Sequence, residues 1–214
     1  MNGRLYWDDS NSIRTIDKLL AEGNLVAGTT DTVIGLFAPA TQQGRALLDA
    51  AKIRNEKPYL ILVDDIKKVL QYVHPDQKSL IAKIGDICWP GPVTLIAKAA
   101  PHIPGYFVST DNTVAFRIPL HPGMQALLKK CGPLFSTSAN ISGEPIPESV
   151  REINPTISKA VSAIIESSRE NSRSEQFYTV PSTIIDCSHD PVRVIRAGNF
   201  DLRLLNPILG YTPR

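Results

Sequence analysis

The sequence lacks the features that mark several common classes of enzyme. It has no G-x-x-x-x-G-K-[ST] phosphate-binding loop, no G-x-G-x-x-G dinucleotide fingerprint and no His-x-x-x-His pair. The four histidines, His74, His102, His121 and His189, are scattered, and each adjoins a proline or an aspartate. We interpret them as surface loop residues, so metal-dependent hydrolysis and histidine-driven nucleophilic catalysis have little support.

Cysteine and long apolar runs are also scarce. Cys88, Cys131 and Cys187 are far apart and show no Cys-x-x-Cys spacing, which argues against a disulfide framework and a zinc site. We expect them to act as small buried hydrophobes in a reducing compartment, so the predicted location is cytoplasmic. No apolar run approaches the length of a membrane span, and we expect neither a signal peptide nor a membrane partner.

The composition is that of an ordinary globular protein. Hydrophobic residues make up 43% of the 214 residues and charged residues 21%, so we expect a single domain over 1–214. The net charge of +2 is too small to indicate a nucleic-acid partner by itself. The 17 prolines predict many short, stiff connections.

The hydrophobic pattern predicts interleaved helices and strands. In the first helix, for example, Ile13, Ile16 and Leu20 share one face and Gly23 follows as a stop signal. We expect helices over 12–22, 42–53, 77–87, 122–130 and 156–168, with a further helical turn from 64. We expect strands over 25–29, 59–63, 92–99, 113–118, 182–186 and 192–195. The order predicts an α/β fold, with a twisted mixed β-sheet flanked by helices. The polar stretch 167–177 is interpreted as a mobile surface loop.

Two polar segments lie at the ends of predicted elements. The segment 29–32 (TTDT) follows a buried strand, and ligands bind at the carboxyl ends of strands in α/β sheets. A turn that only reverses the chain is the alternative. Lys52 and Arg54 end the second helix and converge on one ligand only if the helix unwinds there. Their alternative role is a favourable interaction with the helix dipole.

Arg117 lies in an otherwise apolar strand and needs an anionic partner. That partner is either a ligand carboxylate or phosphate, or an internal Asp or Glu. Thr113 shares its strand face, and the small Ala115 between them leaves room for a ligand. The turn 136–140 (STSAN) offers hydroxyl, amide and backbone donors suited to phosphate, or is a plain turn. The segment 89–94 (WPGPVT) is interpreted as architectural.

Seven segments in this order resemble the YrdC-like family of L-threonylcarbamoyladenylate synthases. They are TDTVIGL at 30–36, KIR at 52–54, WPGPVT at 89–94, RIP at 117–119, SAN at 138–140, STII at 182–185 and RAG at 196–198. The resemblance spans about residues 12–200 and implies the short, single-domain form. It departs from the family pattern at Ile34, which replaces a tyrosine, and at Asn55, which replaces a proline.

The resemblance implies a nucleotidyltransferase that forms threonylcarbamoyl-AMP and pyrophosphate from L-threonine, bicarbonate and ATP, for threonylcarbamoyladenosine modification of tRNA. By resemblance, the catalytic residues are Lys52, Arg54, Ser138 and Asn140. The implied threonine-binding residues are Thr32, Arg117, Ser138 and Ser182. The implied ATP-binding residues are Lys52, Arg54, Thr113, Asn140 and Arg196. Mg²⁺ would be carried by the ATP phosphates, with no metal ligand from the protein.

The proposed chemistry suits these residue types, because two anions must approach one another and cations offset their repulsion. Partner proteins of the tRNA transfer step are also implied.

Two alternatives to this function stay open. One is a module of the same fold that binds double-stranded RNA or tRNA without this activity. The other is a paralogue with a different acyl acceptor, which Ile34 motivates.

Overall fold

The computed structural model describes residues 5–52, 58–167 and 180–209. The strands are β1 Leu5–Tyr6, β2 Val26–Gly28, β3 Gly35–Pro39, β4 Leu60–Leu62, β5 Val93–Lys98, β6 Thr113–Arg117, β7 Leu134–Ser138, β8 Ala163–Glu166, β9 Thr183–Asp186 and β10 Arg193–Arg196. The helices are α1 Ser10–Ala21, α2 Gln42–Lys52, α3 Ile66–Tyr72, α4 Lys78–Cys88, α5 Pro122–Cys131, α6 Pro155–Ala160 and α7 Asn206–Leu209. Short 3₁₀ turns are η1 Pro75–Gln77, η2 Gly105–Phe107, η3 Val150–Glu152 and η4 Leu202–Leu205.

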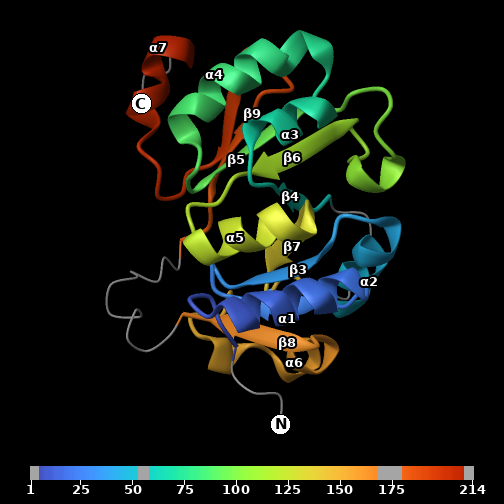
Figure 1. The fold of residues 1–214 in the computed structure, drawn as a ribbon. Coiled ribbons are helices and arrows are strands. Elements are labelled where there is room, and N and C mark those ends of the chain that lie inside the picture. The colour runs from blue at the N-terminus through green and yellow to red at the C-terminus, as the bar shows by residue number, and fades with distance from the viewer. Residues whose placement is uncertain (1–4, 53–57, 168–179, 210–214) are drawn as a thin grey trace.

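In the described part of the chain, one sheet contains all ten strands, in the order β1-β8-β2-β3-β7-β4-β6-β5-β9-β10. Its strands run both ways: β4 and β6 are parallel, for example, whereas β5 and β6 are antiparallel. The predicted α/β fold with a mixed sheet is therefore confirmed (Figure 1).

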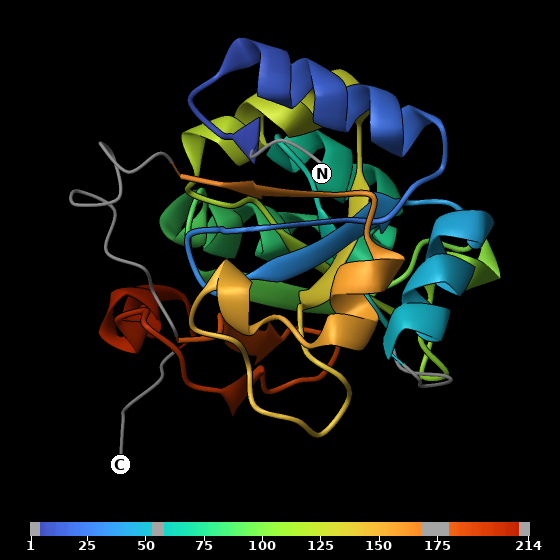
Figure 2. The same ribbon diagram turned by 90° about the horizontal axis from the view of Figure 1, so that it is seen from below.

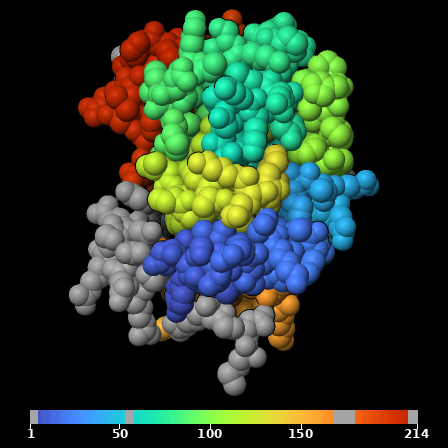
Figure 3. All heavy atoms as spheres, in the orientation of Figure 1, coloured from blue at the N-terminus to red at the C-terminus, as the bar shows by residue number. Residues whose placement is uncertain are grey.

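Helices cover both faces of the sheet. Ile16 of α1 and Leu127 of α5 pack in one buried cluster with Phe37 and Leu62 of the sheet. A second cluster joins the sheet residues whose side chains point the other way to the apolar faces of α2, α3, α4 and α6. Figure 2 shows α1 and α5 on one side of the sheet and α6 on the other. In the space-filling view, α1, α5, α3 and α4 succeed one another across one face of the molecule (Figure 3).

The helix starts follow from side chains that cap exposed backbone N–H groups. Asp9 accepts hydrogen bonds from the N–H groups of Asn11 and Ser12 at the start of α1. The Nδ1 atom of His121 accepts from Met124 N at 3.1 Å, and Pro122 occupies the first turn of α5. His121 is buried, so the interpretation of this histidine as a surface residue is wrong.

The prediction of a helix over 156–168 is correct as far as Ala160 and wrong beyond it. The helix α6 ends at Ala160, and β8 follows as a parallel neighbour of β1 and β2. Burial alternates along β8, as in a strand with two different faces. The β-branched side chains of Ile164 and Ile165 favour this strand, and pairing with β2 overrides the helical spacing.

The remaining differences are smaller. The strands β1 and β3 were not predicted, and β7 extends through Ser138, so the turn that follows it starts at Ala139. Of the predicted polar loop 167–177, Ser167 is buried, and 168–177 lie outside the described residues. None of the helices in the described ranges is both long and apolar enough to cross a membrane.

Candidate functional site

The structure brings most of the predicted site residues together in three groups. The first is centred on Lys52, the last residue of α2, whose side chain is only 2% exposed. Its ammonium group donates to Ser138 O at 2.8 Å, to Asn140 Oδ1 at 2.9 Å and also to Asn140 O. The Ser138 hydroxyl donates to the same Asn140 Oδ1 at 2.5 Å. Lys52 is thus joined, in one largely buried polar cluster, to two residues that lie 86 and 88 positions later in the chain.

Strand pairing places this cluster beside the segment 30–36. Gly35 of β3 pairs with Ser138 of β7, and Ala139 N donates to Ile34 O at 2.8 Å. The side chain of Ile34 is 5% exposed and belongs to the main core. The departure from the family's tyrosine therefore changes a core position.

Arg117, at the end of β6, forms the second group. Its guanidinium is buried and donates from Nε to Gly91 O at 3.1 Å, from Nη1 to Thr32 Oγ1 at 2.6 Å and from Nη2 to Asp31 Oδ1. The other carboxylate oxygen of Asp31 accepts from Leu120 N at 2.8 Å. Burial lowers the pKa of Arg117, and the attraction of Asp31 acts in the opposite direction.

Of the two partners that the sequence allowed for Arg117, the structure contains the internal carboxylate. Asp31 belongs to the predicted polar segment 29–32, but the sequence analysis assigned it no role of its own there. Nη1 and Nη2 of a guanidinium each carry a second N–H group, so the pairing with Asp31 and Thr32 does not by itself exhaust the donors of Arg117.

The third group lies on three adjacent strands, β5, β9 and β10. Arg196 donates from Nε to Ser182 O at 3.0 Å and from Nη2 to Ser182 Oγ at 3.3 Å. Ser182 Oγ and Thr94 Oγ1 are 2.8 Å apart, and both side chains are buried. Burial lowers the pKa of Arg196. Shortly after Arg196, the chain passes so close to the start of β9 that only glycine fits at position 198. A Cβ there would lie 2.3 Å from Pro181 O.

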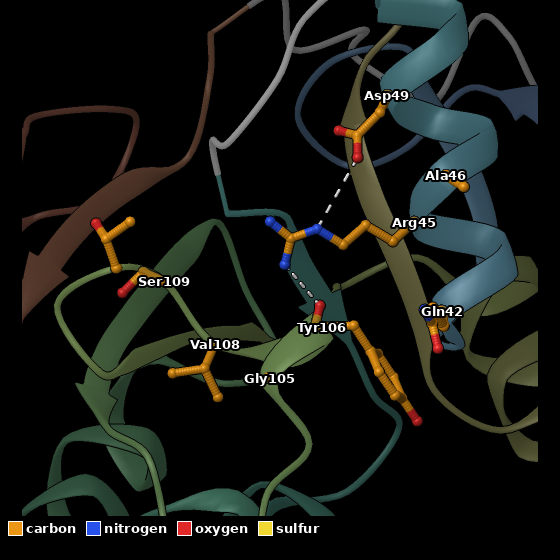
Figure 4. A pocket seen from close by; sticks show the side chains of 9 residues that line it. Gln42, Arg45, Ala46, Asp49, Gly105, Tyr106, Val108 and Ser109 are labelled. Atoms are coloured by element: carbon orange, nitrogen blue, oxygen red, sulfur yellow. Dashed lines mark hydrogen bonds and ion pairs between the residues drawn. The ribbon is translucent and has the colours of Figure 1, made fainter.

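Thr113 begins β6, at the end opposite Arg117, and its hydroxyl is 2.7 Å from that of Ser109. Ser109 lines an open pocket of about 510 Å³ between α2 and the segment around η2 (Figure 4). Arg45 extends across this pocket from α2 and donates to Tyr106 O at 2.9 Å. Thr113 therefore stands apart from the three groups.

The remaining predicted site residue, Arg54, lies outside the described residues.

The described residues contain no group of three or more His, Cys, Asp or Glu side chains arranged to hold a metal ion. The thiols of Cys88, Cys131 and Cys187 are free, and burial raises the pKa of each to about 12. At neutral pH these thiols are protonated, so they are poor nucleophiles.

The fold and this geometry define an α/β protein with a polar site built from strand ends and the end of α2. The chain belongs to the Sua5/YciO/YrdC family, whose model, described as "Telomere recombination", matches residues 18–198. The resemblance found in the sequence is thereby confirmed.

Curated relatives carry the name threonylcarbamoyl-AMP synthase. One from Pyrococcus abyssi is 29% identical over 203 residues, which cover 92% of this chain and 57% of the relative. Another from Pseudoalteromonas translucida is 31% identical over 189 residues, which cover 86% of this chain and 97% of the relative. The chain thus spans little more than half the length of the first of these relatives and almost all of the second.

Solved structures agree with the fold. The crystal structure of P. abyssi Sua5 complexed with L-threonine matches with a TM-score of 0.80 and 28% identity, over 94% of this chain and 58% of that one. The crystal structure of Escherichia coli YciO matches with a TM-score of 0.78 over 95% of this chain and 99% of that one. YciO is 21% identical, so it supports the fold alone.

Proposed function

We propose that this chain is an L-threonylcarbamoyladenylate synthase, which forms threonylcarbamoyl-AMP and pyrophosphate from L-threonine, bicarbonate and ATP. The observation that carries the proposal is the largely buried cluster of Lys52, Ser138 and Asn140, because it unites two of the family's motifs at one strand end. The names of the relatives and the threonine complex of P. abyssi Sua5 support the same activity.

The reaction proceeds in two steps. The amine of threonine attacks the carbon of bicarbonate, and water leaves as the carbamate forms. A carbamate oxygen then attacks the α-phosphorus of ATP while the bond to pyrophosphate breaks. Neither step needs a covalent enzyme intermediate, so positioning and charge stabilisation are sufficient for catalysis. This agrees with the protonated state of the three thiols.

Each group of residues has a proposed part in this reaction. Lys52 fixes the Ser138–Asn140 turn and places positive charge next to it, where the attacking carbamate and the phosphate meet. Arg117 and Thr32 are proposed to hold the carboxylate and hydroxyl end of threonine, with the second N–H groups of the guanidinium as donors. The remaining proposed ligand contacts are Ser182 for threonine and Arg54, Thr113, Asn140 and Arg196 for ATP.

Magnesium is proposed to enter with the ATP phosphates, whose charge it would neutralise. The residues fit this mode of binding, because the described part of the chain has no carboxylate cluster for a resident metal, and the carboxylate of Asp31 is already bonded to Arg117. Transfer of the product to tRNA, together with partner proteins, is the proposed destination of threonylcarbamoyl-AMP.

The test is ATP–pyrophosphate exchange, measured with threonine and bicarbonate omitted in turn. We expect exchange only when both are present. Exchange that requires a different amino acid in place of threonine would identify a paralogue with another acceptor. RNA binding without any exchange would contradict the proposed synthase activity and favour a binding module.

A further inference from the structure

Thr94 belongs to the segment 89–94, which the sequence analysis interpreted as architectural. Its side chain is 5% exposed, and its Oγ1 lies 2.8 Å from Ser182 Oγ. Its place in the sheet nevertheless puts it between two groups that have roles in the proposed reaction.

The strand register shows this position directly. Leu95 of β5 pairs with Phe116 of β6, so the next residues along, Thr94 and Arg117, lie side by side and point to the same face. Thr94 also pairs with Ile184 of β9, and Ser182, two residues earlier, points to the same face. The side chains of Arg117, Thr94, Ser182 and Arg196 therefore form one row across β6, β5, β9 and β10.

At the Arg196 end of this row, the direction of the hydrogen bond to Ser182 is fixed. A guanidinium can only donate, so the contact of Arg196 Nη2 with Ser182 Oγ uses one lone pair of the serine oxygen. The contact between Thr94 and Ser182 can run either way. If Thr94 donates, both lone pairs of Ser182 Oγ are filled and its O–H is free to donate to a ligand. If Ser182 donates instead, that hydrogen is consumed within the protein.

We propose that Thr94 is a positioning residue that donates to Ser182 and so directs the Ser182 hydroxyl toward an anionic oxygen of threonine. A carboxylate is an acceptor only, so its arrival selects the state in which Ser182 donates to it and Thr94 donates to Ser182. This inference rests on the proposed function, because it takes the amino-acid substrate to lie next to Ser182.

The test compares Thr94→Val, which keeps the shape and removes the hydroxyl, with Thr94→Ser, which keeps the hydroxyl. Dissociation constants for threonine and for ATP are measured by calorimetry, with a melting curve for each variant. We expect Thr94→Val to weaken threonine binding by about 5- to 10-fold, as for one lost hydrogen bond, and to change ATP binding by less than about twofold. Thr94→Ser should bind both ligands within about twofold of the wild type.

Several results would overturn the inference: unchanged threonine affinity in Thr94→Val, an equal loss for both ligands, or a serine variant as weak as the valine variant. If Thr94→Val does not fold, Thr94→Ala and Thr94→Ser form the comparison, since both lose the methyl group and differ only in the hydroxyl. If the variants show the expected changes in threonine affinity but the wild-type protein shows no ATP–pyrophosphate exchange, the proposed function is contradicted and the role of Thr94 is not. A wild-type protein that does not bind threonine overturns the inference as well.

Discussion

Lys52 and Arg117 are both buried cations of the candidate site, and the structure holds them in different ways. Lys52 donates to three carbonyl and amide oxygens of one short stretch, Ser138–Asn140, at the end of β7. Arg117 instead joins its own strand to two other parts of the chain, because it binds Asp31 and Thr32 in one and Gly91 in the other. Asp31 extends this network to the backbone before α5.

Because of this difference, we expect the two parts of the site to contribute differently to folding stability and to activity. A buried guanidinium deprived of its carboxylate retains a charge that burial penalises, and several segments lose their connection. Loss of the Lys52 ammonium group acts directly on the stretch Ser138–Asn140, where the proposed chemistry takes place. We therefore expect changes around Arg117 to alter folding stability first, and changes at Lys52 to alter activity first.

The largest effect is expected for Asp31→Ala. It leaves the charge of Arg117 without its carboxylate and removes the acceptor for Leu120 N. We expect a loss of about 3–5 kcal/mol in the free energy of unfolding, or roughly 6–20 °C in melting temperature. Urea denaturation and calorimetry measure both quantities.

The double variant Asp31→Leu, Arg117→Met is the control for this prediction. Replacing a buried ion pair by apolar side chains is often neutral for stability, so the double variant should be more stable than Asp31→Ala. An Asp31→Ala protein with an unchanged melting temperature would show that the pair contributes little and would remove the contrast with Lys52.

The next largest effect is expected for Lys52→Met, which keeps much of the side-chain volume and removes the ammonium group. The lost positive charge should raise the activation free energy by about 2–4 kcal/mol, a size typical of removing one preorganised electrostatic interaction. ATP–pyrophosphate exchange should fall correspondingly, by roughly 30- to 1,000-fold. The melting temperature should fall less than for Asp31→Ala. Near wild-type exchange in this variant would contradict the assignment of Lys52 to the catalytic site.

A more selective effect is expected for Arg117→Lys. Lysine keeps a positive charge for Asp31 but cannot reproduce the planar fork that reaches Thr32, Asp31 and Gly91 together. If Arg117 also binds the carboxylate of threonine, threonine affinity should fall by about 10- to 100-fold while ATP affinity stays within about twofold. Titrations with each ligand and a melting curve measure this. An equal loss for both ligands with a lower melting temperature would assign Arg117 to the scaffold alone.

The sequence predicted the parts of this arrangement that depend on local patterns. The apolar face of α1 and its stop at Gly23 identified that helix, and the basic residues at 52–54 marked the end of α2. Motif order identified the family, which the family model confirms. Local spacing failed at 156–168, where pairing with β2 and β1 turned half of a predicted helix into β8.

The contacts within the site could not be read from the sequence, because they depend on long-range register. Asp31 and Arg117 are 86 positions apart, and Thr94 and Ser182 are 88 positions apart. The sequence showed that Arg117 needs an anion, and it allowed an internal carboxylate without saying which one. Thr94 lies in the family segment WPGPVT, but that segment did not point to Ser182, because this partner is fixed by the parallel pairing of β5 with β9.

A third cation sharpens the comparison by being less buried. Arg45 lies on the same helix as Lys52, donates to Tyr106 O at 2.9 Å and lies 3.9 Å from Asp49, with its side chain 20% exposed (Figure 4). Partly exposed pairs of this kind contribute little, because water screens them. Arg45→Ala should therefore cost about 1 kcal/mol or less in unfolding free energy, which is roughly 2–4 °C in melting temperature, and should leave threonine affinity unchanged. Asp49→Ala is the matched variant, with the difference that Asp49 also accepts from the Tyr59 hydroxyl at 2.7 Å. If Arg45→Ala lost as much unfolding free energy as Asp31→Ala, burial would not decide how much each cation contributes to stability. The contacts of Arg45 across the pocket between α2 and η2 would then stabilise the fold as much as those of Arg117.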